Sequence, residues 1–158
     1  MSTSAPNEAV QAGELVSRAP EETFEAGRRV GERLAGGEIL LLSGTLGAGK
    51  TVFVKGLATG LGLDAAEVSS PSFTLVNRHG EGRLVLYHLD LYRLAEGPVA
   101  AHAVELEELL AEERAVIVIE WAERLGDYRL PAGVWRVQIE GDGEDPRRIN
   151  ITRADAGT

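Results

Sequence analysis

Short apolar runs with no polar face recur along the chain, and segments with helical patterns lie between them. Residues 39–42 (ILLL) and 115–119 (AVIVI) are wholly apolar, and residues 83–89 (RLVLYHL) are apolar along most of their length. Apolar runs of this length predict buried strands. Because these strands alternate with helices, we expect a mostly parallel sheet that helices cover on both faces.

Three helices are predicted between the strands. The first begins at Pro20, a residue that suits a first helical turn, and ends before Gly36. The second starts at Lys50 and ends near Gly60, and the third, which is acidic and amphipathic, runs from His102 to Arg114. One face of the first helix carries four apolar or small residues: Phe24, Gly27, Gly31 and Leu34.

Further strands are expected to pair antiparallel beside the parallel ones. Turns at residues 79–82 and 141–146 separate two pairs of β-rich segments, and the first pair has the turn chemistry of a hairpin. The strands predicted in addition to the apolar runs are residues 14–17, 73–78, 134–140 and 147–153.

Residues 44–51, GTLGAGKT, connect the apolar run 39–42 to the second helix. They match G-x-x-x-x-G-K-[ST] in the strand–loop–helix context of a phosphate-binding P-loop. Glycines let the backbone bring several N–H groups to one anion, and the start of the helix adds its positive dipole end. We therefore predict an α/β, three-layer P-loop NTPase fold, with a mostly parallel sheet and added antiparallel strands.

The P-loop assigns roles to individual residues. Lys50 would reach the β- and γ-phosphates of a nucleotide, and the Thr51 hydroxyl would take one place on Mg²⁺. The alternative is a loop whose glycines merely turn the chain, but one of only two lysines occupies the motif position. The residues predicted to bind nucleotide in this motif are Gly44, Leu46, Gly47, Ala48, Gly49, Lys50 and Thr51.

Two carboxylates end predicted strands. Glu120 follows the run 115–119, where it would emerge at the phosphate end of the sheet. There it would hold Mg²⁺, directly or through water, or orient the attacking water. Asp90 follows the run 83–89 and is a second candidate for the metal. The structural alternatives are that Glu120 caps a buried strand and that Asp90 caps the turn after it.

Other polar residues are less informative. The segment Ser69–Thr74 carries hydroxyl groups and a proline, and it is either a sensor of the γ-phosphate or an ordinary turn. His88 shares a strand face with Asp90 but has no ligand partners at metal spacing, and we interpret His79, His88 and His102 as structural.

Composition narrows the class of protein. We expect one domain at residues 14–153 of the 158, with a disordered tail at 1–13 and a short tail at 154–158. The formal charge is −9 and cysteine is absent, which disfavours direct binding of nucleic acid and excludes thiol chemistry. The chain has no apolar run of about 20 residues and no secretory pattern, so no membrane association is expected and the cytoplasm is the expected compartment.

The identity of the base is predicted by what the chain lacks. It has no asparagine-lysine-x-aspartate motif, which guanine-specific P-loop proteins carry, so adenine and therefore ATP are favoured. No arginine-rich lid segment indicates a small-molecule kinase.

Five segments together resemble one known family. LSGTLGAGKT, SSPSFTLV, LVLYHLDLYRL, ELEELL and VIVIEWAERL, in this order and spacing, are similar to the TsaE (YjeE) family, and the resemblance extends over residues 20–153. HLDLYRL and IEW are far more specific than the P-loop. The resemblance implies a compact P-loop domain that binds ATP with Mg²⁺ and hydrolyses it slowly. The implied partner is the TsaD–TsaB pair, which attaches threonylcarbamoyl to adenosine 37 of tRNA.

The same resemblance implies site residues. Lys50 and Thr51 would bind phosphate and Mg²⁺, Glu120 would be the metal-linked catalytic acid, and Asp90 would be a required active-site carboxylate. Thr23 and Arg147 match family residues near the nucleotide. The chain departs from the family pattern at two positions, because Thr45 replaces an acid and Ser72 replaces a threonine.

Three functions follow from these observations. The first is an accessory ATPase of a tRNA-modifying complex, which contacts tRNA only through its partners. The second is a free-standing phosphotransferase that acts on a small metabolite, and the third is a nucleotide-dependent scaffold without turnover. The acidic charge and the missing lid favour the first, and the sequence leaves the oligomeric state open.

Overall fold

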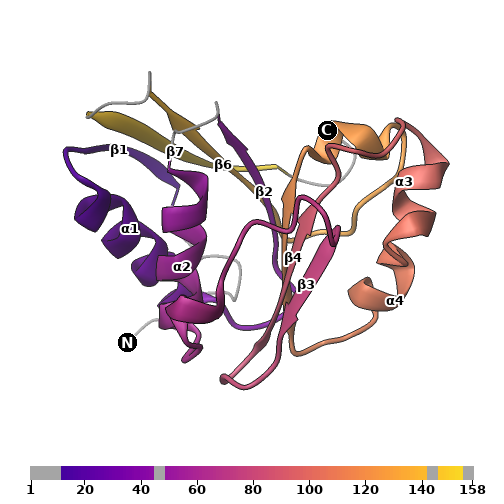
Figure 1. Cartoon of the computed structure of the whole chain (residues 1–158), viewed down its shortest axis with the longest axis horizontal. Coiled ribbons are helices and arrows are strands. Elements are labelled where there is room, and N and C mark those ends of the chain that lie inside the picture. The colour runs from indigo at the N-terminus through magenta and orange to yellow at the C-terminus, as the bar shows by residue number, and fades with distance from the viewer. Residues whose placement is uncertain (1–11, 45–48, 142–145, 155–158) are drawn as a thin grey trace.

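The computed structural model describes residues 12–44, 49–141 and 146–154, and these residues build a seven-stranded sheet (Figure 1). The spatial order of the strands is β1-β7-β6-β2-β5-β4-β3. In chain order the strands are β1 (Gly13–Ser17), β2 (Ile39–Gly44), β3 (Val76–His79), β4 (Val85–Asp90), β5 (Ala115–Glu120), β6 (Val134–Glu140) and β7 (Arg147–Arg153).

The centre of the sheet is parallel and its margins are antiparallel. Strands β6, β2, β5 and β4 run parallel to one another, while β3, β7 and β1 are antiparallel to their neighbours. This arrangement confirms the predicted α/β fold class with its added antiparallel strands.

Helices lie on both faces, as Figure 1 shows. The pair α1 and α2 packs on one face, and α3 and α4 pack on the other. The helical elements are α1 (Pro20–Arg33), α2 (Lys50–Gly60), α3 (Pro98–Ala103), α4 (Leu106–Leu110) and the short 3₁₀ helices η2 (Ala65–Glu67) and η3 (Ala122–Leu125).

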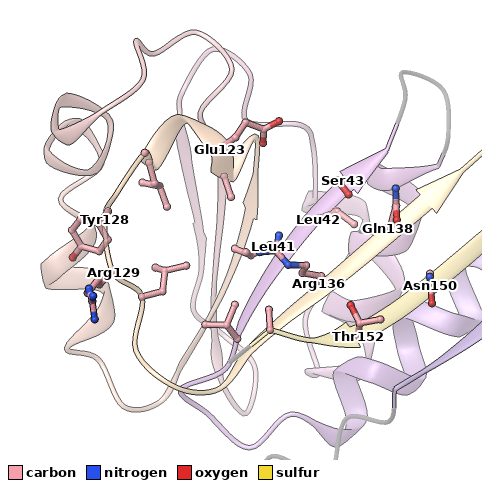
Figure 2. Close-up of a pocket in the computed structure, with 16 residues that line it drawn as sticks. Leu41, Leu42, Ser43, Glu123, Tyr128, Arg129, Arg136, Gln138, Asn150 and Thr152 are labelled. Atoms are coloured by element: carbon pink, nitrogen blue, oxygen red, sulfur yellow. The ribbon is translucent and has the colours of Figure 1, made fainter. Parts of the chain in front are cut away.

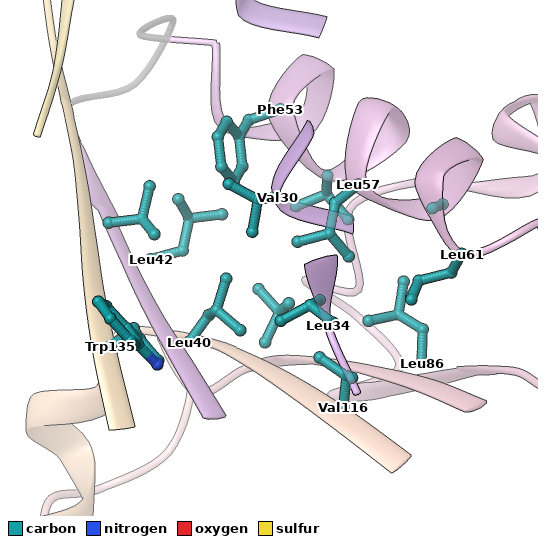
Figure 3. Packing of buried hydrophobic residues seen from close by; sticks show 14 of the residues in the cluster. Val30, Leu34, Leu40, Leu42, Phe53, Leu57, Leu61, Leu86, Val116 and Trp135 are labelled. Atoms are coloured by element: carbon teal, nitrogen blue, oxygen red, sulfur yellow. The ribbon is translucent and has the colours of Figure 1, made fainter. Parts of the chain in front are cut away.

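The four parallel strands β6, β2, β5 and β4 each contribute to two hydrophobic clusters, because side chains alternate between the two faces of a strand. Leu40 and Leu42 of β2 face Phe53 and Leu57 of α2 in the first cluster (Figure 3). Ile117 and Ile119 of β5, on the opposite face, pack with Val104 and Leu106 from the α3–α4 side. Strand β5 is buried along its whole length, which explains why its sequence has no polar face.

Helices α1 and α2 pack with their backbones in contact, and glycines make this possible. A methyl group on Gly27 would lie 2.1 Å from the Phe53 carbonyl oxygen, and one on Gly56 would lie 1.9 Å from that of Phe24. A methyl group on Gly31 or Gly60 would lie 2.2 or 2.4 Å from a backbone carbonyl oxygen of the facing helix. Because no other side chain fits at such distances, the two helices form one tightly packed unit.

The structure corrects the predicted helix His102–Arg114. Its first residues belong to α3, which starts at Pro98, and a separate helix α4 follows a break at Glu105, whose φ of 52° is left-handed. The break has a packing reason. It lets Val104 and Leu106 both enter the same cluster, whereas residues two apart on a continuous helix point in very different directions.

The first strand of the predicted hairpin is also shorter than expected. Strand β3 begins at Val76 rather than Phe73, because the Leu75 N–H bonds to the Pro71 carbonyl in a turn and Leu75 has a φ of 67°. Strand β4 begins at Val85, two residues later than predicted, and includes Asp90 as its last residue.

The predicted tails end differently from expectation. Gly13, assigned to the disordered tail, is the first residue of β1, and Ala154 bonds through its N–H to the Val134 carbonyl. Residues 1–11 and 155–158 of the two tails, and residues 142–145 of the turn, lie outside the described residues. Within the described ranges, no helix has both the length and the apolar character to cross a membrane.

Candidate nucleotide-binding site

Asp90 and Glu120 lie side by side at the carboxyl ends of neighbouring parallel strands. They are register partners in the β4–β5 pair, and Glu120 is also paired with Leu42 of β2, the strand that leads into the P-loop segment. Both carboxylates are buried within the protein. The order of the strands therefore places both predicted acids next to the start of α2.

Helix α2 begins at Lys50, directly after Gly49. Gly49 has a φ of 102°, a left-handed conformation that favours glycine, and it offers no side chain to cap the first helical N–H groups. A helix start of this kind binds anions well, since its N–H groups and dipole both face the ligand. Lys50 and Thr51 occupy the first helical turn, as predicted.

Lys50 and Glu120 are in contact. The Nζ atom of Lys50 lies 3.5 Å from Oε1 of Glu120, and both side chains are largely buried. A lysine on the helix that is predicted to bind phosphate and an acid from the central sheet are therefore brought to one point.

The other oxygen of Glu120 contacts His88, which is fully buried on β4. The distance from His88 Nε2 to Glu120 Oε2 is 2.7 Å. Burial alone would raise the pKa of Glu120. The hydrogen bond from His88 and the ammonium group of Lys50 outweigh this effect, so the pKa of Glu120 is lowered from its ordinary value. The second ring nitrogen of His88, Nδ1, is buried and has no hydrogen-bond partner in the described part of the chain.

His88 is the site neighbour that the sequence did not reveal. The sequence indicates a structural role for it, because it has no ligand partners at metal spacing. In the sheet, His88 pairs with Val118, so Glu120 is its diagonal neighbour on the same face. The one indication in the sequence was its spacing of two residues from Asp90, which places both side chains on the same face of one strand.

Asp90 also has the structural role that was its alternative interpretation. Its Oδ1 atom accepts a hydrogen bond of 2.9 Å from the backbone N–H of Tyr92, which closes the turn after β4. A carboxylate bonded in this way still has its second oxygen for other contacts.

Thr23 and Arg147 lie beside the start of α2. A methyl group on Gly49 would be 3.2 Å from Nη1 of Arg147 and 3.6 Å from Cγ2 of Thr23. Thr23 is buried, and its hydroxyl shares a 2.7 Å hydrogen bond with that of Ser17. Three elements that are distant in sequence thus meet around one glycine.

Part of the predicted loop lies outside the residues that the structure describes. Leu46, Gly47 and Ala48, together with Thr45, lie outside the described residues, whereas Gly44 ends β2. Their assignment as nucleotide-binding residues stays a prediction.

The segment Ser69–Thr74 is held to β3 by Asn77. The Asn77 amide donates to the Ser69 carbonyl at 3.2 Å, and the Thr74 hydroxyl donates to Asn77 Oδ1 at 2.8 Å. These contacts fit an ordinary turn, which is one of the two interpretations that the sequence leaves open for this segment. Ser72, one of the departures from the family pattern, is half-buried in this segment.

A groove of about 930 Å³ lies elsewhere on the molecule (Figure 2). Its walls are the face of β2, β6 and β7 that α1 and α2 do not cover, and residues that follow β5. Ser43, Arg136 and Gln138 project into it, as the figure shows. It includes neither Lys50 nor the two buried carboxylates. We therefore assign the candidate site to Lys50, Asp90 and Glu120 instead of to this groove.

Comparisons with known proteins show which family and which fold the chain resembles. Residues 17–149 match the family model described as threonylcarbamoyl adenosine biosynthesis protein TsaE. A tRNA threonylcarbamoyladenosine biosynthesis protein TsaE from Treponema pallidum is 45% identical over 140 residues, which cover 86% of this chain and 97% of the relative. The protein of the same name from a Nostoc strain is 41% identical over 133 residues, 84% of this chain and 80% of its own.

A solved structure is similar along nearly the whole chain. The crystal structure of Bacillus subtilis YdiB superposes with a TM-score of 0.64 at 32% sequence identity. The match covers 90% of this chain and 87% of that protein.

Proposed function

Because this chain belongs to the TsaE family of threonylcarbamoyl adenosine biosynthesis proteins, we propose that it binds ATP and slowly hydrolyses it as an accessory protein of tRNA threonylcarbamoyladenosine synthesis at position 37. The observation that carries the proposal is the contact of Lys50, at the start of α2, with the buried carboxylate of Glu120. P-loop hydrolases use a phosphate-binding lysine together with an ionised acid near the reacting phosphate.

In this proposal, different residues bind the nucleotide and catalyse its hydrolysis. The first N–H groups of α2 and the Lys50 ammonium bind the phosphates, and Thr23 and Arg147 border the same helix start. Glu120, kept ionised by His88 and Lys50, orients the attacking water or accepts its proton. Asp90 lies beside this carboxylate as its register partner on the neighbouring strand.

The oxygen ligands that are present suit Mg²⁺. The Thr51 hydroxyl and the Glu120 carboxylate are ligand types that this ion prefers, and no cluster of three or more acidic or histidine ligands exists among the described residues. A site with so few protein ligands fits an ion that keeps waters and is held through nucleotide phosphates. When bound, Mg²⁺ neutralises charge on the β- and γ-phosphates.

The partner that we propose is a TsaD–TsaB-type complex, as the family resemblance implies. The formal charge of −9 supports indirect contact with tRNA, because binding to tRNA phosphates by this chain alone would need a positive surface. The cytoplasm is the compartment that we propose, in line with a role in tRNA modification.

The test is to measure ATP hydrolysis by the purified protein with and without the TsaD–TsaB pair. We expect slow Mg²⁺-dependent hydrolysis that the pair alters. Phosphate transfer to a small metabolite, with no response to the pair, would instead support a free-standing phosphotransferase. ATP binding without any turnover would support a nucleotide-dependent scaffold.

A further inference from the structure

An aromatic residue follows each of the two site carboxylates, and the two rings touch. Tyr92 lies two residues after Asp90, and Trp121 directly follows Glu120. Their ring centroids are 4.8 Å apart at a tilt of 51°. Tyr92 is 54% exposed and Trp121 is half-buried, so the pair connects the buried site to the protein surface.

Arg124 from η3 covers this pair. Its guanidinium carbon lies 5.7 Å from the Tyr92 ring centroid and 5.5 Å from that of Trp121. The same guanidinium donates to the Tyr92 carbonyl from Nε and Nη2, at 3.4 and 3.3 Å. The segments after β4 and β5 are therefore tied together at the surface.

A second aromatic–arginine contact lies in the segments that flank Asp90. The Arg93 guanidinium stands 4.3 Å from the ring centroid of Phe73, which is 82% exposed. The turn that contains Phe73 leads directly to Leu75, whose carbonyl accepts the backbone N–H of Asp90 at 3.0 Å. Both aromatic–arginine contacts are thus close to a site carboxylate, either along the chain or through a backbone hydrogen bond.

Trp121 packs against the second hydrophobic cluster, but the fold gives no such reason for the exposed rings of Phe73 and Tyr92, since an apolar ring left in water contributes little to stability. Aromatic residues and arginine are the types that carry most of the binding energy at protein–protein interfaces. Exposed acids at Glu96, Glu123 and Asp127 interrupt the two segments, so the surface lacks the continuous positive charge that tRNA phosphates need.

We propose that this aromatic–arginine surface is where a protein partner docks and acts on the site carboxylates. Its partner must offer an apolar pocket for the exposed rings and carboxylates for the two guanidinium groups. The inference rests on the proposed function, in which that partner is the TsaD–TsaB-type complex. The surface consists of Phe73, Tyr92, Arg93, Trp121 and Arg124.

The backbone provides the connection from the surface to the chemistry. The Tyr92 N–H bonds to the Asp90 carboxylate, and the Leu91 N–H bonds to the Glu120 carbonyl at 3.1 Å. Trp121 has a φ of 61°, a strained conformation for a bulky residue. A partner that seats Tyr92 or Trp121 therefore changes the position of the adjoining acids.

The experiment measures the affinity of the TsaD–TsaB pair for the wild type and for Phe73→Ala and Arg93→Ala, and the pair concentration that gives half of the maximal change in ATP turnover. We expect each substitution to weaken binding at least about tenfold and to raise that concentration equally, with the maximal change retained. The control is Val16→Ala, which removes another exposed apolar side chain, at 42% exposure on edge strand β1, and should bind like the wild type.

The outcomes separate the two proposals. Equal binding by wild type and both surface variants would overturn the docking surface alone. Failure of the wild type to bind the pair would overturn the partnership and this surface with it. Tight tRNA binding that the two substitutions abolish would assign the surface to RNA and overturn its role in protein docking. Thermal unfolding of each variant verifies that it is folded.

Discussion

Lys50 and Glu120 form a largely buried ion pair, with 3.5 Å between Nζ and Oε1 and side-chain exposures of 17% and 6%. Both members of this pair have a proposed role in the reaction: Lys50 binds the phosphates, and Glu120 acts on the attacking water. Phosphates would attract the lysine by their greater negative charge, and Glu120 would keep His88 as its second partner. Exchange of partners at this pair is therefore expected to accompany nucleotide binding.

Lys50→Ala should abolish measurable ATP affinity, because the site loses the positive charge that faces the β- and γ-phosphates. Isothermal titration calorimetry measures this directly. The control is Lys55→Ala, which removes the only other lysine, from the same helix, and should bind ATP like the wild type. Nearly unchanged affinity in the Lys50 variant would reject the P-loop assignment.

Glu120→Gln should keep ATP binding and lose hydrolysis by about 100-fold or more, since an amide preserves shape but accepts a proton poorly. The measurement is single-turnover hydrolysis alongside ATP affinity. Asp90→Asn is the companion variant, because its amide oxygen can still accept the Tyr92 N–H and hold the turn. If Glu120→Gln hydrolyses ATP within about threefold of the wild type, Glu120 is a strand cap and Asp90 takes its role.

His88→Leu should lower the ATP turnover rate by about tenfold or more, because the Glu120 carboxylate loses the hydrogen bond that orients it. His88→Gln, which can still donate to a carboxylate, should retain more of the rate. Turnover and ATP affinity are compared in both variants, with His102→Leu at an exposed position as the control. Equal losses in the leucine and glutamine variants would argue for a packing role alone.

The lowered pKa of Glu120 makes a prediction about stability and pH. Its folded-state pKa lies below the ordinary value of 4.5, so ionised Glu120 stabilises the fold above that pH. This contribution is lost as the pH falls through the lowered pKa. Urea unfolding should therefore show a larger stability advantage of the wild type over Glu120→Gln at about pH 5.5 than at about pH 3. An advantage that grows toward pH 3 would contradict the direction of the shift.

Gly56→Ala should destabilise the protein by about 2 kcal/mol or more, because the new methyl group would lie 1.9 Å from the Phe24 carbonyl oxygen. Chemical unfolding measures the change. Gly13→Ala provides the matched control, since a methyl group there meets no heavy atom within 4 Å. If the two variants are equally stable, the close approach of the helices is not required for folding.

The fold was predictable from the sequence because its strongest features are local. The wholly apolar runs of β2 and β5 and the Gly-rich turn between β2 and α2 each reflect short-range chemistry. The same rules predicted that Glu120 and Asp90 end strands at one edge of the sheet, and the register confirms that they are neighbours.

Features that depend on three-dimensional packing were not predictable in the same way. His88 meets Glu120 only because β4 and β5 pair in one particular register. The break at Glu105 depends on which side chains the sheet accepts, and the apolar pattern of the segment alone favoured a continuous helix. Contacts between distant segments are set by the assembled sheet, so the pattern within one segment does not contain them.

The glycine contact between α1 and α2 also restricts which parts of the molecule can move. Helices whose backbones touch at Gly27 and Gly56 cannot slide past one another, so Thr23 and Lys50 travel as parts of one rigid body. The segments after β4 and β5 are linked to it through the sheet and side-chain contacts instead. Conformational change during a nucleotide cycle is therefore expected to displace Tyr92 and Trp121 while the helix pair serves as the fixed frame.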